Sequence, residues 1–382
     1  MGMNTSVKKN ALKIMPVFGT RPEAVKMCPL VNELKRRSGI ETTVTVTGQH
    51  REMLDPVLNT FGVVPDHDLS VMKENQTLFD VTSSVLEGMR DVLEKEKPDV
   101  VLVHGDTTTA FAAALSAYYL SIPVGHVEAG LRTYDNMSPY PEEFNRQAIG
   151  SIALYHFAPT KLAASRLIRE GKDREHVYIT GNTVVDAMRH TVSSDYTHPA
   201  LCAEKDKKLI FITAHRRENL GNPMRGMFRA IRRVLEEHPD LYAVYPVHKN
   251  PLVRSIAGEI FSGCPQVRLI EPLDVIDCHN FESRCYLCLT DSGGLQEECP
   301  SYGRPVLVMR NTTERPEGIE AGTLRLVGTE EESVYRAFKE LIEDRSAYEK
   351  MARASNPFGD GKASERIADI LEKGEYSPFS NS

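Results

Sequence analysis

Short apolar runs alternate with amphipathic helical patterns along most of the chain. Nearly continuous Val, Ile and Leu strands that alternate with helices are typical of parallel sheets covered on both faces. The predicted helices include Pro22–Arg37, Leu78–Glu94, Thr107–Tyr119 and Pro223–Glu237. The predicted strands form two series, first Lys13–Phe18, Thr43–Thr47, Val100–Val103, Pro123–Val127 and His176–Ile179, then Lys208–Thr213, Tyr242–Val247, Val267–Ile270, Tyr286–Leu289 and Pro305–Met309.

Two series of strands predict two doubly wound, Rossmann-like α/β domains. We place the first at residues 11–181 and the second at 182–361, with the boundary after the last strand of the first series. The length of 382 residues also exceeds what one core normally supports. A final helical pattern at 362–373 follows a turn-rich segment and could cap the second domain or cross back to the first.

Charge and hydropathy narrow the class of protein. The net charge of -7 gives no general attraction for nucleic acid or for an anionic membrane. No apolar run approaches the ~20 residues that span a bilayer, and the polar first ten residues do not resemble a signal peptide. We therefore expect a cytoplasmic enzyme that holds any phosphate locally.

The cysteines do not predict a metal site. Their odd number, seven, fits a reducing compartment. Cys285 and Cys288 have CxxC spacing, but they lie in an apolar run and no second cysteine pair follows at zinc spacing. We interpret them as buried strand thiols.

The segment from Phe18 to Lys26 has the pattern of a strand followed by an anion-binding helix start. Pro22 suits the first helical turn, and Gly19 would let an anion approach the N–H groups there. Arg21 and Lys26 add cations suited to a diphosphate. The alternative is an ordinary capped helix with exposed cations.

A second turn, after the predicted strand Tyr286–Leu289, repeats this pattern. The amides of Gly293 and Gly294 and the hydroxyl of Ser292 predict another anion site, and Glu298 could accept both hydroxyls of a ribose. Ligands of open α/β sheets bind beyond the carboxyl ends of the strands. Two such turns therefore favour a nucleotide-binding enzyme.

Carboxylates follow several predicted strands or begin helices. Asp106 and Glu128 each follow a strand of the first series, and Glu142 and Glu143 begin a helix. Each has an ordinary explanation as a helix cap or as a partner of the helix dipole. Several acids beside a polyanion site instead favour proton transfer, with raised pKa values.

His215 follows the first strand of the second series and precedes two arginines. At the end of a buried strand, an imidazole can donate to a phosphate or relay a proton. A structural role is the alternative for a lone histidine, and the flanking cations favour the functional one.

These residues lie in motifs that together closely resemble the non-hydrolysing UDP-N-acetylglucosamine 2-epimerases. The resemblance runs in order from about Lys13 to Leu371. It implies a glycosyltransferase-B-like fold, with two Rossmann-like domains facing a central cleft, commonly as a homodimer, and with helix 362–373 packed on the first domain. The motifs are FGTRPEAVKM, TGQHREM, VLVHGDTTT, PVGHVEAGLRT, SPYPEEFNRQ, TGNTVVDA, TAHRRENLG, YPVHKNP, DSGGLQEE and TTERPEG.

The resemblance implies reversible epimerisation of UDP-N-acetylglucosamine to UDP-N-acetylmannosamine for bacterial surface polysaccharide synthesis. UDP would leave to give 2-acetamidoglucal and then add back, without a nicotinamide or any other cofactor. The positions that match the family's catalytic residues are Asp106, Glu128, Glu142 and His215. Those that match its UDP-binding set are Arg21, Lys26, Ser292, Gly293, Gly294, Glu298 and Arg315.

Some relatives carry a second, activating substrate site. Its matching positions here are Gln49, His50, Arg216 and His248. Glu52 stands where relatives can carry Gln, and Asn75 where they can carry Arg. A gained carboxylate and a lost guanidinium would weaken diphosphate binding, so we expect reduced or absent substrate activation.

Three other functions compete with this one. A hydrolysing epimerase would release the free sugar, but the segment 21–23 and the Glu142–Glu143 pair look more like the non-hydrolysing branch. A glycosyltransferase would leave the acids unexplained. A nucleotide-sugar sensor would lose affinity by placing carboxylates near a diphosphate.

Overall fold

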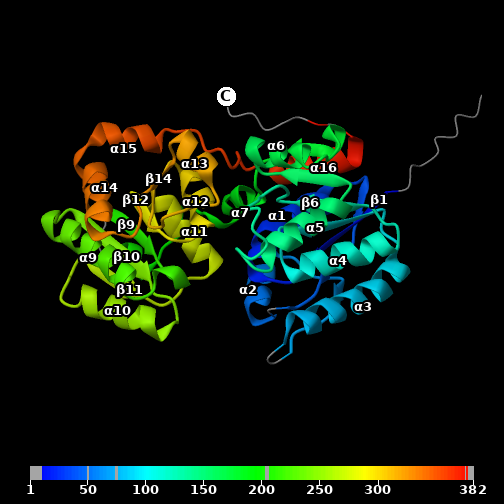
Figure 1. Ribbon diagram of the computed structural model, residues 1–382, viewed down its shortest axis with the longest axis horizontal. Coiled ribbons are helices and arrows are strands. Elements are labelled where there is room, and N and C mark those ends of the chain that lie inside the picture. The colour runs from blue at the N-terminus through cyan, green and yellow to red at the C-terminus, as the bar shows by residue number, and fades with distance from the viewer. Residues whose placement is uncertain (1–10, 50, 74–75, 203–205, 375, 377–382) are drawn as a thin grey trace, which may run out of the picture. The chain divides into compact units, whose positions relative to one another are not determined.

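The computed structural model describes residues 11–49, 51–73, 76–202, 206–374 and 376 (Figure 1). The chain forms two compact units. The first extends to Ala187 and resumes at Gly361, and the second runs from Met188 to Asp360. Within the described residues, no helix has the length and apolar character needed to cross a membrane.

The first unit is built on an eight-stranded sheet with strand order β4-β3-β1-β5-β6-β7-β8, in which β2 also pairs with β1. Each of its pairings is parallel. The strands are β1 (Leu12–Phe18), β2 (Ile40–Thr42), β3 (Thr45–Val46), β4 (His67–Asp68), β5 (Val100–His104), β6 (Val124–Val127), β7 (Tyr155–Ala158) and β8 (Val177–Ile179).

Helices pack against this sheet through its apolar side chains. Met15 of β1 and Val101 of β5 belong to one core cluster with Val85, Met89 and Ala113 of the neighbouring helices. The helices are α1 (Arg21–Arg36), α2 (Arg51–Phe61), α3 (Leu78–Glu96), α4 (Thr108–Tyr119), α5 (Glu142–Ile152), α6 (Lys161–Arg169), the 3₁₀ turn η1 (Arg174–His176), and α7 (Thr183–Thr191), which continues into the second unit.

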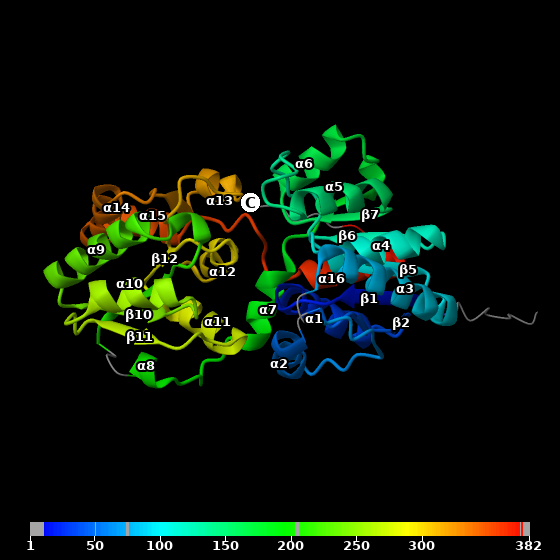
Figure 2. The ribbon, with the colours of Figure 1, turned by 60° about the horizontal axis from the view of Figure 1, so that its bottom comes forward.

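The C-terminal helix α16 (Ala363–Lys373) completes the first unit and lies beside α1 (Figures 1 and 2). Arg37 Nη1 donates to Asp369 Oδ1 at 2.6 Å. The N–H of Ser364, at the start of α16, donates to Asp186 Oδ1 at 2.7 Å. Since Asp186 lies on α7, the last helix is fixed to two elements of the first unit.

The second unit has a six-stranded parallel sheet with order β11-β10-β9-β12-β13-β14. Its strands are β9 (Lys208–Thr213), β10 (Leu241–Pro246), β11 (Val267–Ile270), β12 (Leu287–Thr290), β13 (Val306–Val308) and β14 (Leu324–Leu326). Its helices are α8 (Pro199–Cys202), η2 (Arg217–Asn219), α9 (Asn222–Glu237), α10 (Pro251–Phe261), α11 (Val275–Arg284), α12 (Leu295–Glu298), η3 (Cys299–Tyr302), α13 (Pro316–Ala321), α14 (Glu331–Glu343) and α15 (Arg345–Ala352).

Both faces of the second sheet are buried. Ile210 and Ile212 of β9 join a core cluster with Phe228 and Phe338, whereas Phe211 joins a different cluster. Alternate residues of a strand point to opposite faces, so β9 is covered on both sides. The α/β fold predicted from the apolar strands is therefore confirmed in each unit.

Each sheet has a topological switch point. In the first unit the strand order reverses between β1 and β5, and in the second it reverses between β9 and β12. Open α/β sheets bind ligands just beyond the carboxyl ends of strands at such points. The residues that follow these four strands are therefore the first candidates for a site.

Candidate functional site

The start of α1 is closed by its own side chains. Thr20 and Glu23 form a capping box, and the N–H groups of Gly19 and Thr20 donate to Glu23 Oε2 at 3.0 and 2.8 Å. Burial raises the pKa of Glu23, which also accepts from Thr107 Oγ1 at 2.6 Å. The expectation that an anion would approach the amide of Gly19 is therefore wrong, because a carboxylate already bonds it.

Gly19 has a packing role instead. A Cβ added there would lie 1.9 Å from Thr47 Oγ1, so only glycine fits.

Among the described residues, no ion-pair partner is found for Arg21, the first residue of α1. Arg21 is thus the cation at this helix start that remains available to a ligand.

Lys26 is engaged by a catalytic candidate. Its ammonium forms an ion pair with Glu128 Oε2, which also accepts from Asn182 Nδ2 at 2.7 Å. His104 Nε2 lies 3.9 Å from the same oxygen, and burial lowers the pKa of His104 to about 4. The Glu128 carboxylate therefore has a cation and an amide beside it, with a neutral imidazole nearby.

Asp106 follows β5 and lies next to a second cation. Arg146 Nη2 of α5 is 2.5 Å from Asp106 Oδ2. Burial raises the pKa of Asp106, partly offset by the charge of Arg146, and the charges of Glu128 and Glu142 raise it further. The three predicted acids of the first unit therefore lie close enough for Glu128 and Glu142 to change the pKa of Asp106.

The two neighbouring glutamates of α5 differ in role. Glu143 is buried and accepts from the N–H groups of Thr133 and Tyr134, each at 3.0 Å. Burial acts to raise its pKa, but its hydrogen bonds outweigh this effect and hold the pKa below the ordinary value. Glu142 Oε2 is buried without a hydrogen-bond partner among the described residues. Glu143 therefore shapes the loop, a role that the Oε2 atom of Glu142 does not share.

In the second unit, the buried Asp291 arranges the turn after β9. Its carboxylate accepts from the N–H of His215 at 3.0 Å and from that of Arg216 at 2.9 Å, and Asn219 Nδ2 donates to it at 3.1 Å. Asp291 thereby fixes the loop that carries the predicted histidine.

His215 itself is half-exposed and stacks on His248, with ring centroids 5.4 Å apart. Burial lowers the pKa of His215, and the charges of His248 and Arg216 lower it further, while Asp291 opposes them. The imidazole is therefore neutral near pH 7, a state in which it can both accept and donate a proton.

The predicted phosphate turn lies after β12. Gly294 precedes α12, and a Cβ there would lie 3.1 Å from Glu298 Oε1. The turn therefore lies against Glu298, the residue predicted to bind the ribose hydroxyls. A Cβ on Gly293 would lie 3.7 Å from Arg216 Nη2, which places a guanidinium against the turn. Ser292 N donates to Thr290 Oγ1 at 2.9 Å.

Arg315 precedes α13 and forms an ion pair with Glu297, which is almost fully buried. The carboxylate fixes the guanidinium near α12, the helix that carries Glu298.

Of the predicted activating-site residues, Gln49 accepts from Thr109 Oγ1 at 2.8 Å in the first unit. His50 and Asn75 lie outside the described residues.

In the described part of the chain, the residues with metal-ligand geometry are His279, Glu282 and Glu298. Burial and the charge of Glu298 raise the pKa of Glu282 well above its ordinary value. Cys285 and Cys288 are buried free thiols, but only Cys288 lies in a strand, β12, as predicted, because Cys285 ends α11 as its C-cap residue.

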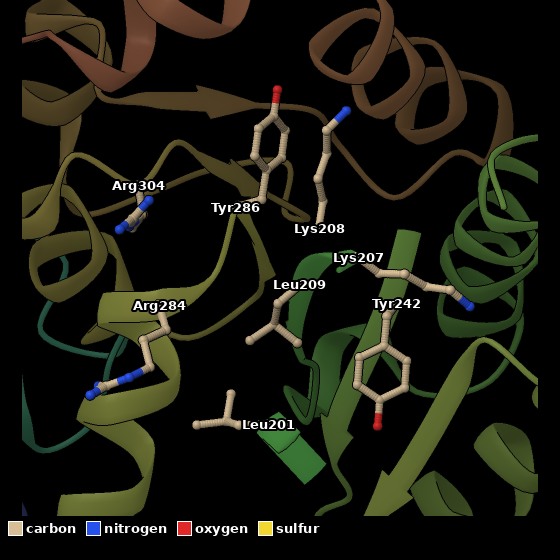
Figure 3. Close-up of a pocket in the computed structure, with 8 residues that line it drawn as sticks. All are labelled: Leu201, Lys207, Lys208, Leu209, Tyr242, Arg284, Tyr286 and Arg304. Atoms are coloured by element: carbon tan, nitrogen blue, oxygen red, sulfur yellow. The ribbon is translucent and has the colours of Figure 1, made fainter. Parts of the chain in front are cut away.

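A pocket of about 370 Å³ lies at the other edge of the second sheet (Figure 3). Lys208 and Tyr242 in its lining belong to the first residues of β9 and β10. His215 and Ser292 instead follow the carboxyl ends of strands. The pocket is therefore separate from the predicted site.

Four residues that pair with or orient the predicted site residues were not predicted. They are Arg146, Asn182, Asp291 and Glu297. Arg146 lies one helical turn after Glu142, so helical spacing could have found it. Asn182 and Asp291 lie in motifs that carry the family resemblance, but their partners are remote in sequence and only the fold brings them together.

Comparison with known proteins shows the family to which the chain belongs. The family model for UDP-N-acetylglucosamine 2-epimerase matches residues 32–372. A Bacillus subtilis protein named UDP-N-acetylglucosamine 2-epimerase is 56% identical, covering 94% of this chain and 95% of its own.

Solved structures agree as well. The Neisseria meningitidis UDP-GlcNAc 2-epimerase bound to UDP-GlcNAc has 45% identity and a TM-score of 0.87, covering 95% of this chain and 100% of its own. The glycosyltransferase of kitacinnamycin, at 14% identity, TM-score 0.66 and coverage of 96% and 99%, shares the fold alone. The chain belongs to the UDP-N-acetylglucosamine 2-epimerase family.

Proposed function

We propose that the protein interconverts UDP-N-acetylglucosamine and UDP-N-acetylmannosamine by eliminating UDP and adding it back. The observation that carries the proposal is the placement of Asp106 and Glu128 after adjacent strands, β5 and β6, each with its own cation. A family relative has been solved with UDP-GlcNAc bound, which supports the same substrate here.

The chemistry needs acids of this kind. The C2 proton is too weakly acidic for a carboxylate to remove directly, so the C1–O bond to UDP must break as C2–H is lost. The products are 2-acetamidoglucal and UDP. Return of a proton to the opposite face of C2, with re-addition of UDP at C1, gives the epimer. Proton transfer on both faces requires more than one acid–base group.

We assign the proton transfers to Asp106, Glu128 and Glu142. The raised pKa of Asp106 suits a group that must both release and regain a proton. Lys26 forms an ion pair with Glu128, so we assign Lys26 a positioning role in addition to any contact with phosphate.

Charge that develops on departing UDP needs donors. We propose that Arg21, Arg315, His215 and the turn from Ser292 to Gly294 supply them, and that Glu298 accepts from the ribose hydroxyls. The donors must also retain UDP, because its escape would convert epimerisation into hydrolysis.

Incubation with UDP-N-acetylglucosamine in deuterated water tests this function. NMR should show deuterium at C2 and accumulating UDP-N-acetylmannosamine, with little free sugar. Free N-acetylmannosamine in step with UDP would assign the protein to the hydrolysing branch. Absence of exchange at C2 would contradict an epimerase.

The proposal extends to regulation and assembly. We expect a hyperbolic rate curve for the substrate, because Glu52 adds an exposed negative charge to the first turn of α2. A sigmoidal curve abolished by Gln49→Ala would contradict this. We also propose a cytoplasmic homodimer that supplies surface polysaccharide synthesis, and light scattering at twice the chain mass would support the dimer.

A further inference from the structure

Two glutamates and a histidine converge in the second unit, and one of them, Glu298, is the proposed acceptor of the ribose hydroxyls. His279 and Glu282 lie three residues apart on α11 and so share one helix face. Glu298 comes from α12. One ligand atom from each of the three residues lies within 4.8 Å of the other two, close enough to surround a single ion.

Burial makes this cluster unusual. His279 is 3% exposed and Glu282 is 0% exposed. No hydrogen-bond donor among the described residues reaches Glu282 Oε2, and the carboxyl group of Glu282 lies against that of Glu298. An ionised carboxyl group that is buried in this way is costly unless it is paired or coordinates a metal. A bound cation would compensate both carboxylates.

The surroundings support a metal ligand set. Thr191 Oγ1 lies 2.7 Å from His279 Nδ1 and fixes the orientation of the ring, as partners of metal-binding histidines commonly do. The thiol of Cys278 donates to Glu282 Oε1 at 3.0 Å and so orients that carboxyl group. An imidazole ligand together with carboxylate ligands favours Zn²⁺ or Co²⁺ over Mg²⁺ or Ca²⁺.

We propose that His279, Glu282 and Glu298 bind one divalent transition-metal ion, of which Zn²⁺ is the expected type. Three protein ligands leave a fourth tetrahedral position for water. The ion is not needed for the proposed epimerisation. Helix α12 would thus contribute Glu298 to two kinds of binding, of a metal ion and of the ribose.

A consequence rests on the proposed function, because Glu298 is also the proposed ribose ligand. A carboxylate engaged by Zn²⁺ is a weaker acceptor for ribose hydroxyls. Zn²⁺ should therefore weaken UDP binding, and UDP should weaken Zn²⁺ binding by the same factor, about 5- to 150-fold for typical coupled sites.

Titration of the full, untagged, chelator-treated protein with Zn²⁺ tests the site, with Co²⁺ absorption as a report on ligand geometry. We expect one Zn²⁺ per chain, and at least about a tenfold loss of affinity in Glu282→Gln and His279→Gln. Glu330→Gln, an exposed glutamate of the same unit, is the matched control and should bind as the parent does. Thermal melting establishes that each variant is folded.

Failure of Zn²⁺ to bind saturably, or equal binding by Glu282→Gln and the parent, would overturn the proposal. Calorimetric titration of UDP with and without Zn²⁺ then tests the coupling. Saturable Zn²⁺ binding that leaves the UDP affinity unchanged would retain the metal site and reject the role of Glu298 in ribose binding. An inactive protein that still binds Zn²⁺ would count against the proposed function alone.

Discussion

Lys26 and Glu128 form a largely buried ion pair within the first unit, with side chains 15% and 8% exposed. Removing one partner leaves the other charge buried and uncompensated, which costs about 3–5 kcal/mol. We therefore expect Lys26→Met to lower the stability of the first unit by about that amount in urea unfolding. The double variant Lys26→Met/Glu128→Gln should recover most of it. Lys13→Met, at the exposed Lys13–Glu41 pair, should cost less than about 1 kcal/mol.

Asp106→Asn should suppress deuterium exchange at C2 by about 100-fold or more, because an amide cannot transfer the proton. The affinity for UDP, measured by calorimetry, should change little. Asp91→Asn, at an exposed aspartate, serves as the control. A fully active Asp106→Asn variant would show that this acid has another role.

Adjacent glutamates should give opposite results. Glu142→Gln should lower kcat by about 100-fold without changing the melting temperature, since the buried Oε2 of Glu142 has no hydrogen-bond partner among the described residues. Glu143→Gln should cost about 1–3 kcal/mol of stability, because the carboxylate accepts from two backbone N–H groups. If both variants lost only activity, the structural role of Glu143 would be wrong.

Gly294→Ala should weaken UDP binding by about tenfold, because the new Cβ would lie 3.1 Å from Glu298 Oε1 and displace that carboxylate. The backbone itself accepts alanine, with φ -61° and ψ -49°. Gly258→Ala, in α10, is the control, since nothing lies within 4 Å of its Cβ position. The control should keep its UDP affinity and gain about 0.5–1 kcal/mol of stability.

Acid should destabilise the first unit through His126. Burial lowers the pKa of His126 from its ordinary value of 6.5 to about 3, and its Nε2 lies 2.7 Å from Gly105 O. Between these pKa values the unfolded chain binds a proton that the folded chain does not. The free energy of unfolding is therefore not reduced by His126 above pH 6.5. It falls as the pH falls below that value, by about 2 kcal/mol at pH 5.

Urea unfolding of His126→Gln at pH 7 and pH 5 checks this contribution. The variant should lose about 2 kcal/mol less than the parent between these pH values. His190→Gln, at an exposed histidine, should behave as the parent does. An unchanged pH dependence in His126→Gln would contradict the assignment.

The long apolar strands and the residues after them were predictable from the sequence. Strands β1, β5, β6, β9 and β12 lie within a residue or two of their predicted bounds. The short strands β2, β4 and β14 were missed, because two or three residues carry no periodic signal. β7 was missed because Tyr155 and His156 interrupt its apolar character.

The site shows the same division between local and long-range information. The capping box of Thr20 and Glu23 was readable from its spacing, but the segment was interpreted as an anion site. The partners of Glu128 and Asp106 could not be predicted, because Asn182 and Arg146 reach them only through the fold. Local patterns therefore located the acids but not the groups that set their charge.

The return of α16 to the first unit makes the second unit an insertion within the first. A fragment that stops at Ala187 would lack the α16 partners of Arg37 and Asp186, and would expose the side of α1 that α16 contacts. The second unit, in contrast, is one uninterrupted stretch of chain from Met188 to Asp360. During synthesis, the first unit therefore begins before the second but is completed only after it, when α16 has been made.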